Sequence, residues 1–303
     1  MRKIAVFYYS QSGQAKEVAK SIFSDKNLNN SNLNIIYKEI KSIQKYPFPW
    51  SKDQFFGVFA ECRLGTPPSG IEHIDFSDIS DAEIVIVVGQ PWFLSPSLPL
   101  QSFFKDNEVR NFLSKRDVVF ISVCRNMWLN TKGRVGEYIR SAGANFVGHI
   151  VLQDQSPNLI SVITIVRWLI NGKKEGTKFL PLAGVSKRDI EQSSRFGKII
   201  FNYLDGDSSN SLQDMLLSEG AIDYKPSIIF LERTGYRIFG LWAKFVVRGG
   251  EFGSSERRWR EGLFYYYLLF ILFCLSPFVQ FFYFITLPFR DLKSLKSKDC
   301  SLN

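Results

Sequence analysis

The stretch that decides the fold is Ile4-Ala-Val-Phe-Tyr-Tyr9, which runs directly into Ser10-Gln-Ser-Gly-Gln-Ala15. Six consecutive apolar residues followed by serine and glycine predict a buried strand that ends in a tight turn. The next residues, 15–23, have the apolar spacing of a helix. A strand that passes through a short hydroxyl-rich loop into a helix is typical of the opening unit of a parallel α/β sheet.

The same alternation continues along the chain. Apolar runs predict four further strands, and segments with helical spacing lie between or after them. The expected strands are Leu33–Ile40, Ile84–Gly89, Val118–Cys124 and Phe146–Leu152, and the expected helices are Leu98–Asn107, Lys132–Ala142 and Lys187–Leu204. This order predicts an α/β fold with a doubly wound, five-stranded parallel sheet covered on both faces. A ligand of such a sheet binds at the carboxyl ends of the strands.

The loop after the first strand is the strongest binding motif of the chain. It consists of Ser10, Gln11, Ser12, Gly13, Gln14 and Ala15. Its hydroxyls, its backbone N–H groups and the start of the helix behind it suit a phosphate group. It is neither a Walker A loop nor a GxGxxG fingerprint. Taken by itself, the loop is also compatible with an ordinary strand-to-helix turn.

In its place after strand one, the loop resembles the phosphate-binding loop of flavodoxin-like proteins, [ST]-x-[ST]-G-x-[ST]. Ser10, Ser12 and Gly13 match this pattern, whereas Ala15 replaces the last hydroxyl residue. The resemblance implies a flavodoxin-like fold with FMN as cofactor. The missing hydroxyl leaves a cofactor-free scaffold open as an alternative.

Two later loops fall where flavodoxin-like proteins hold the flavin ring. One follows the third strand and begins Gln90-Pro91-Trp92-Phe93, and the other follows the fourth and reads Arg125-Asn126-Met127-Trp128. The resemblance implies that the aromatic members of both loops stack on the ring. It also implies that Gln90 and Asn126 bind the polar edge of the ring.

The first 205 residues bear a closer resemblance. The segments FYYSQSGQ (7–14), YPFPW (46–50), FFGVFAECRLGTPP (55–68) and VGQPWFLSPSLP (88–99) resemble flavodoxin-like proteins of dialkylresorcinol and flexirubin-type pigment biosynthesis, often labelled dialkylresorcinol condensing enzymes. The resemblance implies a flavin enzyme that aromatises a dialkyl-cyclohexanedione to a dialkylresorcinol. It also implies a ketosynthase and an acyl carrier protein of the same pathway as partners.

Two inserts in the predicted domain 1–205 indicate a lipophilic ring substrate. The insert 44–75 is rich in aromatic residues, and the insert 156–184 contains the apolar run LISVITIVRWLI. Long inserts in an α/β fold commonly form lids or binding loops, and extra core is the alternative. The aromatisation needs a base near the flavin, and the candidates are His73, Tyr8 and Asp53.

The predicted second part, 206–303, is expected to associate with membrane lipid. From Lys225 onward, twelve Lys or Arg stand against six Asp or Glu, which is +6 of the total charge of +9. The segment 262–289 has no charged residue and exceeds the roughly 18 apolar residues that mark a membrane segment. Because Pro277 divides it and basic residues flank both ends, a re-entrant hairpin is favoured over a single tilted span. The chain is therefore expected at the cytoplasmic face of the inner membrane.

The segment 233–248 before it has the pattern of an amphipathic helix. Its basic residues are Arg233, Arg237, Lys244 and Arg248, and its opposite side carries Ile238, Phe239, Trp242, Phe245 and Val246. A helix of this composition suits a lipid interface. Packing of the apolar side against the rest of the protein is the alternative.

Composition excludes several other classes. The chain has 303 residues and 28 Phe, and no recognisable nucleic-acid motif accompanies its basic charge. Four scattered Cys and two His form neither a CxxC pair nor an HExxH motif, so no metal site is predicted. Three hypotheses therefore stay open: an FMN oxidoreductase, an electron carrier or quinone reductase on the membrane, and a scaffold without cofactor.

Overall fold

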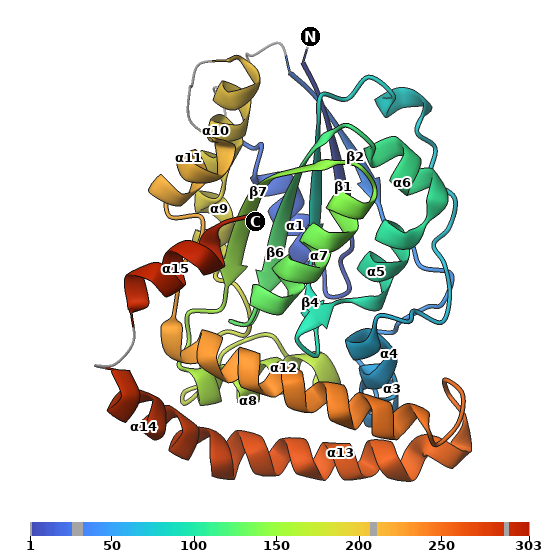
Figure 1. Ribbon diagram of the computed structural model, residues 1–303, viewed down its shortest axis with the longest axis vertical. Helices are drawn as coiled ribbons and strands as arrows, with labels where there is room; N and C mark the ends of the chain where they lie inside the picture. Colours follow the sequence, from blue (N-terminus) through green and yellow to red (C-terminus); the bar gives the residue numbers. More distant parts are fainter. Residues whose placement is uncertain (1, 26–32, 207–210, 288–290, 303) are drawn as a thin grey trace.

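A computed structural model describes residues 2–25, 33–206, 211–287 and 291–302. Its centre is a parallel sheet with the strand order β2-β1-β3-β6-β7 (Figure 1). The strands are β1 (Arg2–Tyr8), β2 (Leu33–Glu39), β3 (Ile84–Gly89), β6 (Asp117–Cys124) and β7 (Asn145–Gln153). This is the order 2-1-3-4-5 of flavodoxin-like sheets. The predicted α/β fold with a five-stranded parallel sheet is confirmed. The first and last residues of each expected strand lie within two residues of those observed.

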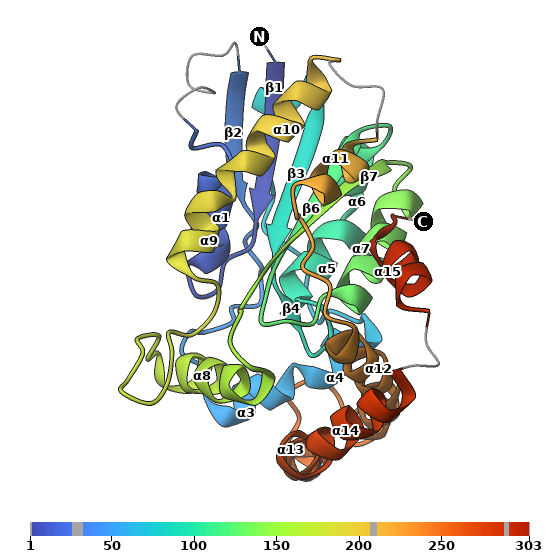
Figure 2. The same ribbon diagram turned by 90° about the vertical axis from the view of Figure 1, so that its left-hand side faces the viewer.

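Helices cover both faces of the sheet (Figure 2). One face carries α1 (Gln14–Ser21), α9 (Lys187–Gln192), α10 (Ser194–Leu204) and α11 (Leu212–Ser218), and the other carries α5 (Leu98–Lys105), α6 (Asn107–Leu113) and α7 (Leu129–Ser141). Because side chains alternate along a strand, Ile4 and Val6 of β1 enter the core under α1, whereas Ala5 and Phe7 enter the opposite core. Both cores are therefore built from the same apolar runs.

Two helical predictions need correction. The helix expected over 187–204 is divided into two helices at Ser193, which is the C-cap of α9. The Oγ of Ser193 donates to the backbone carbonyl of Ile190 at 2.6 Å, in the last turn of α9. Helix α11 was expected to belong to the C-terminal part, but its Leu212 and Leu216 are buried in the core of the sheet. Helix α11, at the start of the predicted second part, therefore belongs to the α/β sandwich.

A further layer of helices lies beyond the carboxyl ends of the strands, and we call it the cap (Figures 1 and 2). It consists of α3 (Lys52–Gly57), α4 (Phe59–Leu64), α8 (Asn158–Asn171), α12 (Pro226–Val247), α13 (Arg258–Phe270), the π-helical η3 (Ile271–Leu275) and α14 (Ser276–Thr286). Both predicted inserts contribute to it, α3 and α4 from the first and α8 from the second. The cap covers the edge of the sheet where a ligand is expected.

Helix α12 packs on the protein with the face that was expected to meet lipid. Ala243 and Val246 are fully buried, and they share a cluster with Phe59 and Ala60 of α4. The predicted lipid-facing orientation of this helix is wrong, and the alternative of packing against the protein is correct. Its basic residues Arg237, Lys244 and Arg248 point to solvent instead.

The uncharged segment forms a continuous helix rather than a hairpin. Helix α13 passes through η3 into α14 without a reversal (Figure 1), and η3 ends just before the turn that contains Pro277. A π-helical turn accommodates backbone groups that a proline leaves without a hydrogen bond. No helix in the described part of the chain combines the length and the apolar character needed to cross a membrane. Residues 288 and 289 of the segment lie outside the described residues.

The remaining elements are short. They are η1 (Ser77–Ile79), β4 (Pro91–Trp92), β5 (Ser95–Pro96), η2 (Ser255–Arg257) and the last helix, α15 (Leu292–Cys300). Strands β4 and β5 form an antiparallel hairpin directly after β3. Helix α15 returns to the sheet, where Cys300 is buried beside Trp128 and Ile222.

Candidate functional site

The loop between β1 and α1, which the sequence predicts to bind an anion, turns into the helix at Gly13. Gly13 is the N-cap of α1 with φ at 89°, a left-handed conformation that favours glycine. The Lys16 amide in the first turn of α1 donates to Ser10 Oγ at 3.1 Å, whereas the N-cap residue, Gly13, has no side chain to cap the helix. Residues 10–13 are half-buried. The start of α1 therefore offers backbone N–H groups of the kind that bind phosphate, and Ser12 lies in the same loop.

The other residues of the loop hold it in place. The side-chain amide of Gln14 donates through Nε2 to the backbone carbonyl of Val185 at 2.9 Å, and its Oε1 accepts from the backbone N–H of Val185 at 3.1 Å. Gln11 donates to the carbonyl of Pro47 at 3.0 Å, which joins the loop to the first insert. Ala15 is buried in the core beneath α1. The side chains of Gln14 and Ala15 are thus structural, and it is the backbone N–H groups of these two residues that remain candidates for binding a phosphate group.

Trp92 is enclosed by aromatic rings of the chain itself. Its ring centroid lies 5.9 Å from that of Tyr9, 5.2 Å from Tyr46 and 5.2 Å from Trp50, each time edge to face. Such contacts stabilise by about 0.5–1.5 kcal/mol each beyond the area they bury. The ring is committed to this cluster, so its expected stacking on a flavin is not supported.

Phe93 lies at the tip of the hairpin and packs into the cap. Phe93 and Leu94 have φ values of 45° and 62°, a left-handed conformation that is unfavourable for residues with a side chain. The ring of Phe93 lies 4.8 Å from Phe55 and 5.2 Å from Phe59. These contacts offset the strain. Pro91 and Gln90, before the tip, remain half-buried at the carboxyl end of β3.

Trp128 also belongs to the core rather than to an open site. It is buried with Val151 of β7 and Ile229 of α12. Its backbone N–H and that of Leu129 donate to Glu232 Oε2, at 3.0 and 3.1 Å. The prediction that Trp128 stacks on a flavin is therefore not supported.

Glu232 caps the start of α7 from a position more than a hundred residues away. Besides the two bonds above, its Oε1 accepts from the backbone and the side chain of Asn130 at 2.8 and 3.0 Å. The carboxyl is fully buried, and this burial raises its pKa to about 7. No local signal in the sequence identifies this residue, because its partners lie on another element.

Arg125 and Asn126 remain as the polar residues at the carboxyl end of β6. Arg125 donates to the backbone carbonyl and to Oδ1 of Asn158, at 3.1 and 2.7 Å, and contacts the sulfur of Met127. Burial lowers the pKa of Arg125 to about 10, so it stays charged at neutral pH. Asn126 donates to Asn158 at 3.0 Å, while its own Oδ1 is buried without a partner among the described residues.

Asn126 is one of several residues here with an unsatisfied oxygen. Among the buried side-chain oxygens for which the described residues offer no hydrogen-bond partner are those of Ser95, Ser97, Gln101, Asn126 and Thr131. They come from the β4–β5 hairpin, from α5 and its N-cap, from the loop after β6 and from the start of α7, and β5 packs against α7. Oxygens of this kind are normally satisfied by water or by a ligand. Asn126 Oδ1, at the carboxyl end of β6, is thus a buried acceptor whose chemistry fits an N–H group at the polar edge of a flavin.

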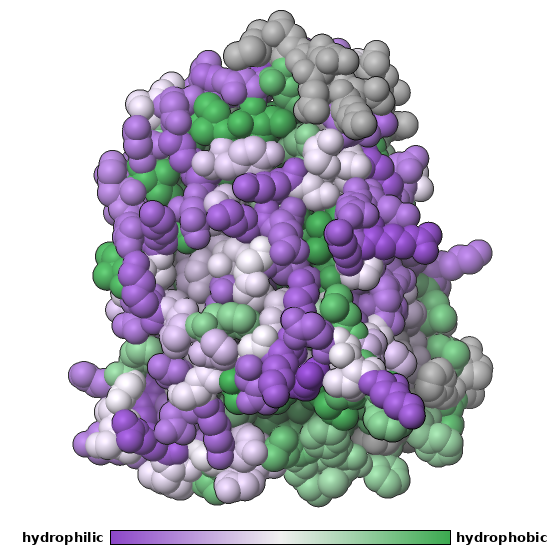
Figure 3. Space-filling model, turned by 180° about the vertical axis from the view of Figure 1, so that it is seen from behind, coloured by the Kyte–Doolittle hydropathy of each residue, from purple (hydrophilic) through white to green (hydrophobic). Residues whose placement is uncertain are grey.

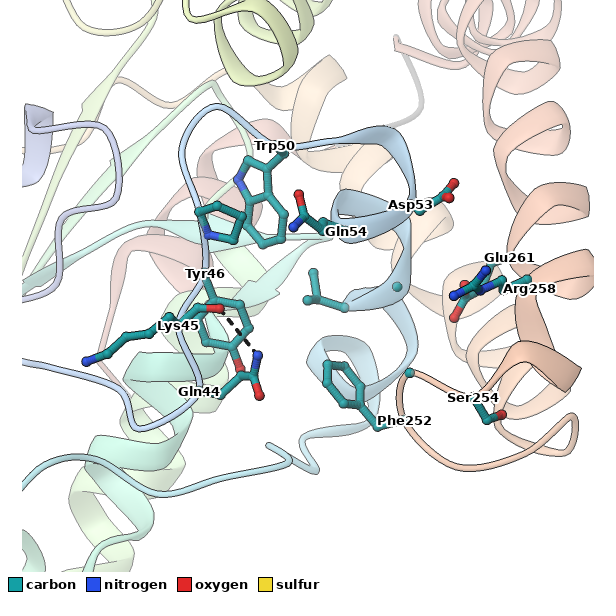
Figure 4. Close-up of a pocket in the computed structure, with 14 residues that line it drawn as sticks. Gln44, Lys45, Tyr46, Trp50, Asp53, Gln54, Phe252, Ser254, Arg258 and Glu261 are labelled. Carbon is teal, nitrogen blue, oxygen red and sulfur yellow. Dashed lines mark hydrogen bonds between the residues drawn. The ribbon is translucent and has the colours of Figure 1, made fainter.

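A cavity of about 260 Å³ lies between the first insert and the turn that joins α12 to α13 (Figure 4). Its apolar wall includes Tyr46, Trp50, Val58 and Phe252, and its polar residues include Lys45, Asp53, Gln54, Arg258 and Glu261. Tyr46 and Trp50 also touch Trp92 at the carboxyl end of β3. The rings of Tyr46 and Trp50 therefore connect the wall of the cavity to the carboxyl end of β3.

The three candidate bases lie in different places. Asp53, on α3, lines the cavity. Tyr8 ends β1, but its side chain is buried under α1, and this burial raises its pKa above its ordinary value. His73 is exposed beside α6, where its Nδ1 lies 2.9 Å from Glu108 Oε2, and the structure does not bring it to the carboxyl edge of the sheet. Of the three, Asp53 is the one that lines the cavity beside the first insert.

Cysteine and metal chemistry have little support in the described residues. Cys62 and Cys124 are buried, and burial raises the pKa of both thiols, which disfavours a reactive thiolate. The described part of the chain contains no group of three or more His, Cys, Asp or Glu arranged to hold a metal ion.

Comparison with known proteins yields structural matches only. No protein-family model matches the chain, and no curated protein matches its sequence. A flavoprotein from Lactobacillus acidophilus, in complex with FMN, has 18% identity and a TM-score of 0.38, over 51% of this chain and 94% of that one. A WrbA-like flavodoxin from Agrobacterium tumefaciens has 10% identity and a TM-score of 0.40, over 69% and 100%.

An azoreductase from Bacillus anthracis has 8% identity and a TM-score of 0.36, over 65% of this chain and 99% of that one. These solved structures are similar to the chain at low identity and low TM-score. The assignment of the fold rests on the strand order of the sheet itself.

Proposed function

We propose that the protein is an FMN-dependent oxidoreductase that acts on a lipophilic ring. The observation that carries this proposal is the edge of the sheet between β1, β3 and β6. A helix start with glycine as its N-cap and a serine-rich loop lies at one end, and the unsatisfied oxygen of Asn126 lies at the other. Ser12 and the first N–H groups of α1 would bind the phosphate group. Asn126 Oδ1 would accept a hydrogen bond from the ring, and Gln90 lies on the neighbouring loop.

The substrate is proposed to be a dialkyl-cyclohexanedione, which becomes a dialkylresorcinol. The resemblance of the N-terminal segments supports this choice, and so does the aromatic cavity beside Trp92. Aromatisation removes two hydrogens from the ring, one as a hydride and one as a proton, and bound FMN would accept the hydride. Asp53 lines the cavity and would take the proton from the acidic carbon of the dione. A ketosynthase and an acyl carrier protein are the proposed partners that supply the ring.

The absorption spectrum of the purified protein tests the cofactor. We expect flavin bands, FMN on release with acid, and bleaching of the bands under anaerobic conditions when a dialkyl-cyclohexanedione is added. Asn126→Ala is expected to weaken FMN binding by roughly tenfold, because a hydrogen bond to a buried group is lost. Asn145→Ala, in an exposed position at the start of β7, is the matched control and is expected to bind FMN as the wild type does.

A scaffold without cofactor is the second candidate, and specific contacts favour it. Trp92 and Trp128 are packed into the protein, and Ala15 offers no hydroxyl. A colourless protein that does not bind added FMN would support the scaffold and overturn the oxidoreductase. A yellow protein that NAD(P)H reduces and diones do not would identify the electron carrier or quinone reductase instead.

A further inference from the structure

The outer face of the helix α13–η3–α14 is a row of exposed apolar side chains. Its members are Trp259, Leu263, Tyr266, Phe270, Phe273, Phe278, Phe281 and Ile285, and their exposed fractions range from 45% to 71%. Up to Phe273 they are three or four residues apart, which places them on one side of a helix. We call this set the apolar row. Figure 3 shows part of it as hydrophobic surface at the lower end of the molecule.

The opposite face of the same helix is fixed on the protein. Phe264 is fully buried, and its ring stacks on that of Phe59 with centroids 3.6 Å apart. Tyr283, in α14, is 3% exposed. The helix therefore lies along the surface of the cap, with the apolar row on its outer face.

A basic row accompanies the apolar row on the neighbouring helix α12. Arg237, Lys244 and Arg248 are exposed and stand on one side of α12 together with Leu241, which is 70% exposed. Figure 1 shows α12 and α13 side by side. A second basic and apolar site follows α8, where Phe179 is 85% exposed and Lys178 lies over its ring. Both sites belong to the cap end of the molecule (Figure 2).

We infer that the cap docks in the plane of an anionic lipid bilayer, with the apolar row inserted between the headgroups. Exposed aromatic and aliphatic side chains beside a row of Arg and Lys are the composition of an interfacial helix. No charged residue interrupts the segment from Gly262 to Thr286, so it can enter the apolar part of the interface. The basic residues of the neighbouring helix α12 favour anionic headgroups by charge complementarity. The carboxyl edge of the sheet then faces the lipid. This inference does not depend on the proposed cofactor.

Flotation of the full chain with lipid vesicles tests the docking. We expect binding to phosphatidylcholine vesicles that contain phosphatidylglycerol, weaker binding to pure phosphatidylcholine, and release by high salt. The triple variant Phe270→Gln, Phe278→Gln, Phe281→Gln is expected to lower the partition coefficient by about tenfold or more. The matched control is Ile43→Gln, which changes an apolar residue that is 59% exposed after β2 and is expected to leave binding unchanged.

The basic row is tested separately. Lys244→Gln with Arg248→Gln is expected to lower binding to the anionic vesicles by about fivefold per charge removed. Lys187→Gln with Arg188→Gln removes the same charge from α9, on the face of the sheet, and is expected to have little effect. Circular dichroism and thermal unfolding establish that each variant is folded.

Cys274 gives a readout that needs no apolar substitution. It is the exposed one of the four cysteines, and it follows Phe273 in η3. A polarity-sensitive dye on Cys274 is expected to shift to the blue with anionic vesicles. The same dye on Lys20→Cys in a Cys274→Ser background is expected not to shift, because α1 lies away from the cap (Figure 2).

Three results would overturn the inference. The first is a wild-type chain that fails to bind anionic vesicles. The second is a folded triple variant that binds them as the wild type does. The third is a dimer in ultracentrifugation that the triple variant converts to a monomer. This result overturns the inference if the triple variant binds vesicles as the wild type does and the dye emission does not change with vesicles.

Discussion

Glu232 is the residue at which the chemistry of the sheet edge depends most directly on pH. The pKa of a glutamate in an unfolded chain is about 4.3, and burial raises that of Glu232 to about 7. Between these values the folded state binds more protons than the unfolded state. The contribution of this group to stability therefore falls as the pH rises from about 4.3 to about 7, and is constant above that.

The variant Glu232→Gln isolates this effect. Burial lowers the pKa of His149, which makes folding less favourable below about pH 6.5 and opposes the effect of Glu232, so the two proteins must be compared at each pH. From pH about 5 to about 8, we expect the unfolding free energy of the wild type to fall relative to that of the variant, on the order of 3 kcal/mol. Urea unfolding across this range measures it. A constant difference between the two proteins would contradict the prediction.

Arg257 joins the turn between α12 and α13 to α4 of the first insert through a buried ion cluster. Its guanidinium lies 2.7 and 3.0 Å from the two carboxylate oxygens of Glu61, and 2.8 Å from Glu261, and it is 1% exposed. Arg257→Met leaves two buried carboxylates without their cation, so we expect a loss of about 3–5 kcal/mol in urea unfolding. Lys45→Met breaks the exposed pair with Glu72 and serves as the control, with an expected loss below about 1 kcal/mol. Equal losses would show that the cluster is not buried in solution.

At the scale of the elements, the contact between α10 and the end of α1 depends on one glycine. A Cβ at Gly197 would lie 2.0 Å from the carbonyl oxygen of Ile22, which is backbone and cannot turn away. Gly197→Ala should therefore force the helices apart and destabilise the fold by about 1–3 kcal/mol.

Gly133→Ala is the matched control in α7, where a Cβ meets nothing within 4 Å. That change should stabilise by about 0.5–1 kcal/mol, because alanine favours the helix. Thermal unfolding of both variants measures the change in stability, which should be a loss for Gly197→Ala and a gain for Gly133→Ala. A change in the same direction for both would contradict the prediction.

The elements also show what sequence patterns can and cannot predict. Ile84–Gly89 is buried at every position, and a continuous apolar run of this kind predicts a central parallel strand without further information. The loop at Ser10–Gly13 is equally local, since serine and glycine determine the turn themselves. The apolar side of segment 233–248 predicts an amphipathic helix, but periodicity does not say what covers the apolar face, and here α4 covers it.

The candidate site could be predicted only where its chemistry is local. Asn126 and Ser12 follow strands, and strand ends are visible in the sequence. The packing of Trp92 and Trp128 could not be predicted, because their partners are distant residues of the inserts and the C-terminal part. Glu232 caps α7 from α12 for the same reason, and no spacing rule connects the two segments.

At the scale of the whole molecule, α15 fastens the C-terminal part to the sheet. Asp299 is 3% exposed, forms an ion pair with Arg233 of α12 and accepts from the hydroxyl of Tyr224 at 2.7 Å. Lys132 of α7 donates to the backbone carbonyls of Asp299 and Ser301 at the end of α15. One buried carboxylate thus connects elements that are far apart in the sequence.

Asp299→Ala should release α15 and leave the sheet intact. The cation of Arg233 and the hydroxyl of Tyr224 lose their buried partner, which costs several kcal/mol locally. Hydrogen exchange followed by mass spectrometry should show faster exchange in α15 and at the start of α12, with β1 and β3 unchanged, because local opening does not require the centre of the sheet to unfold. Lys296→Ala, an exposed position on the same helix, is the control and should leave exchange as in the wild type. Uniformly faster exchange in β1 and β3 would mean instead that α15 is part of the same cooperative unit as the sheet.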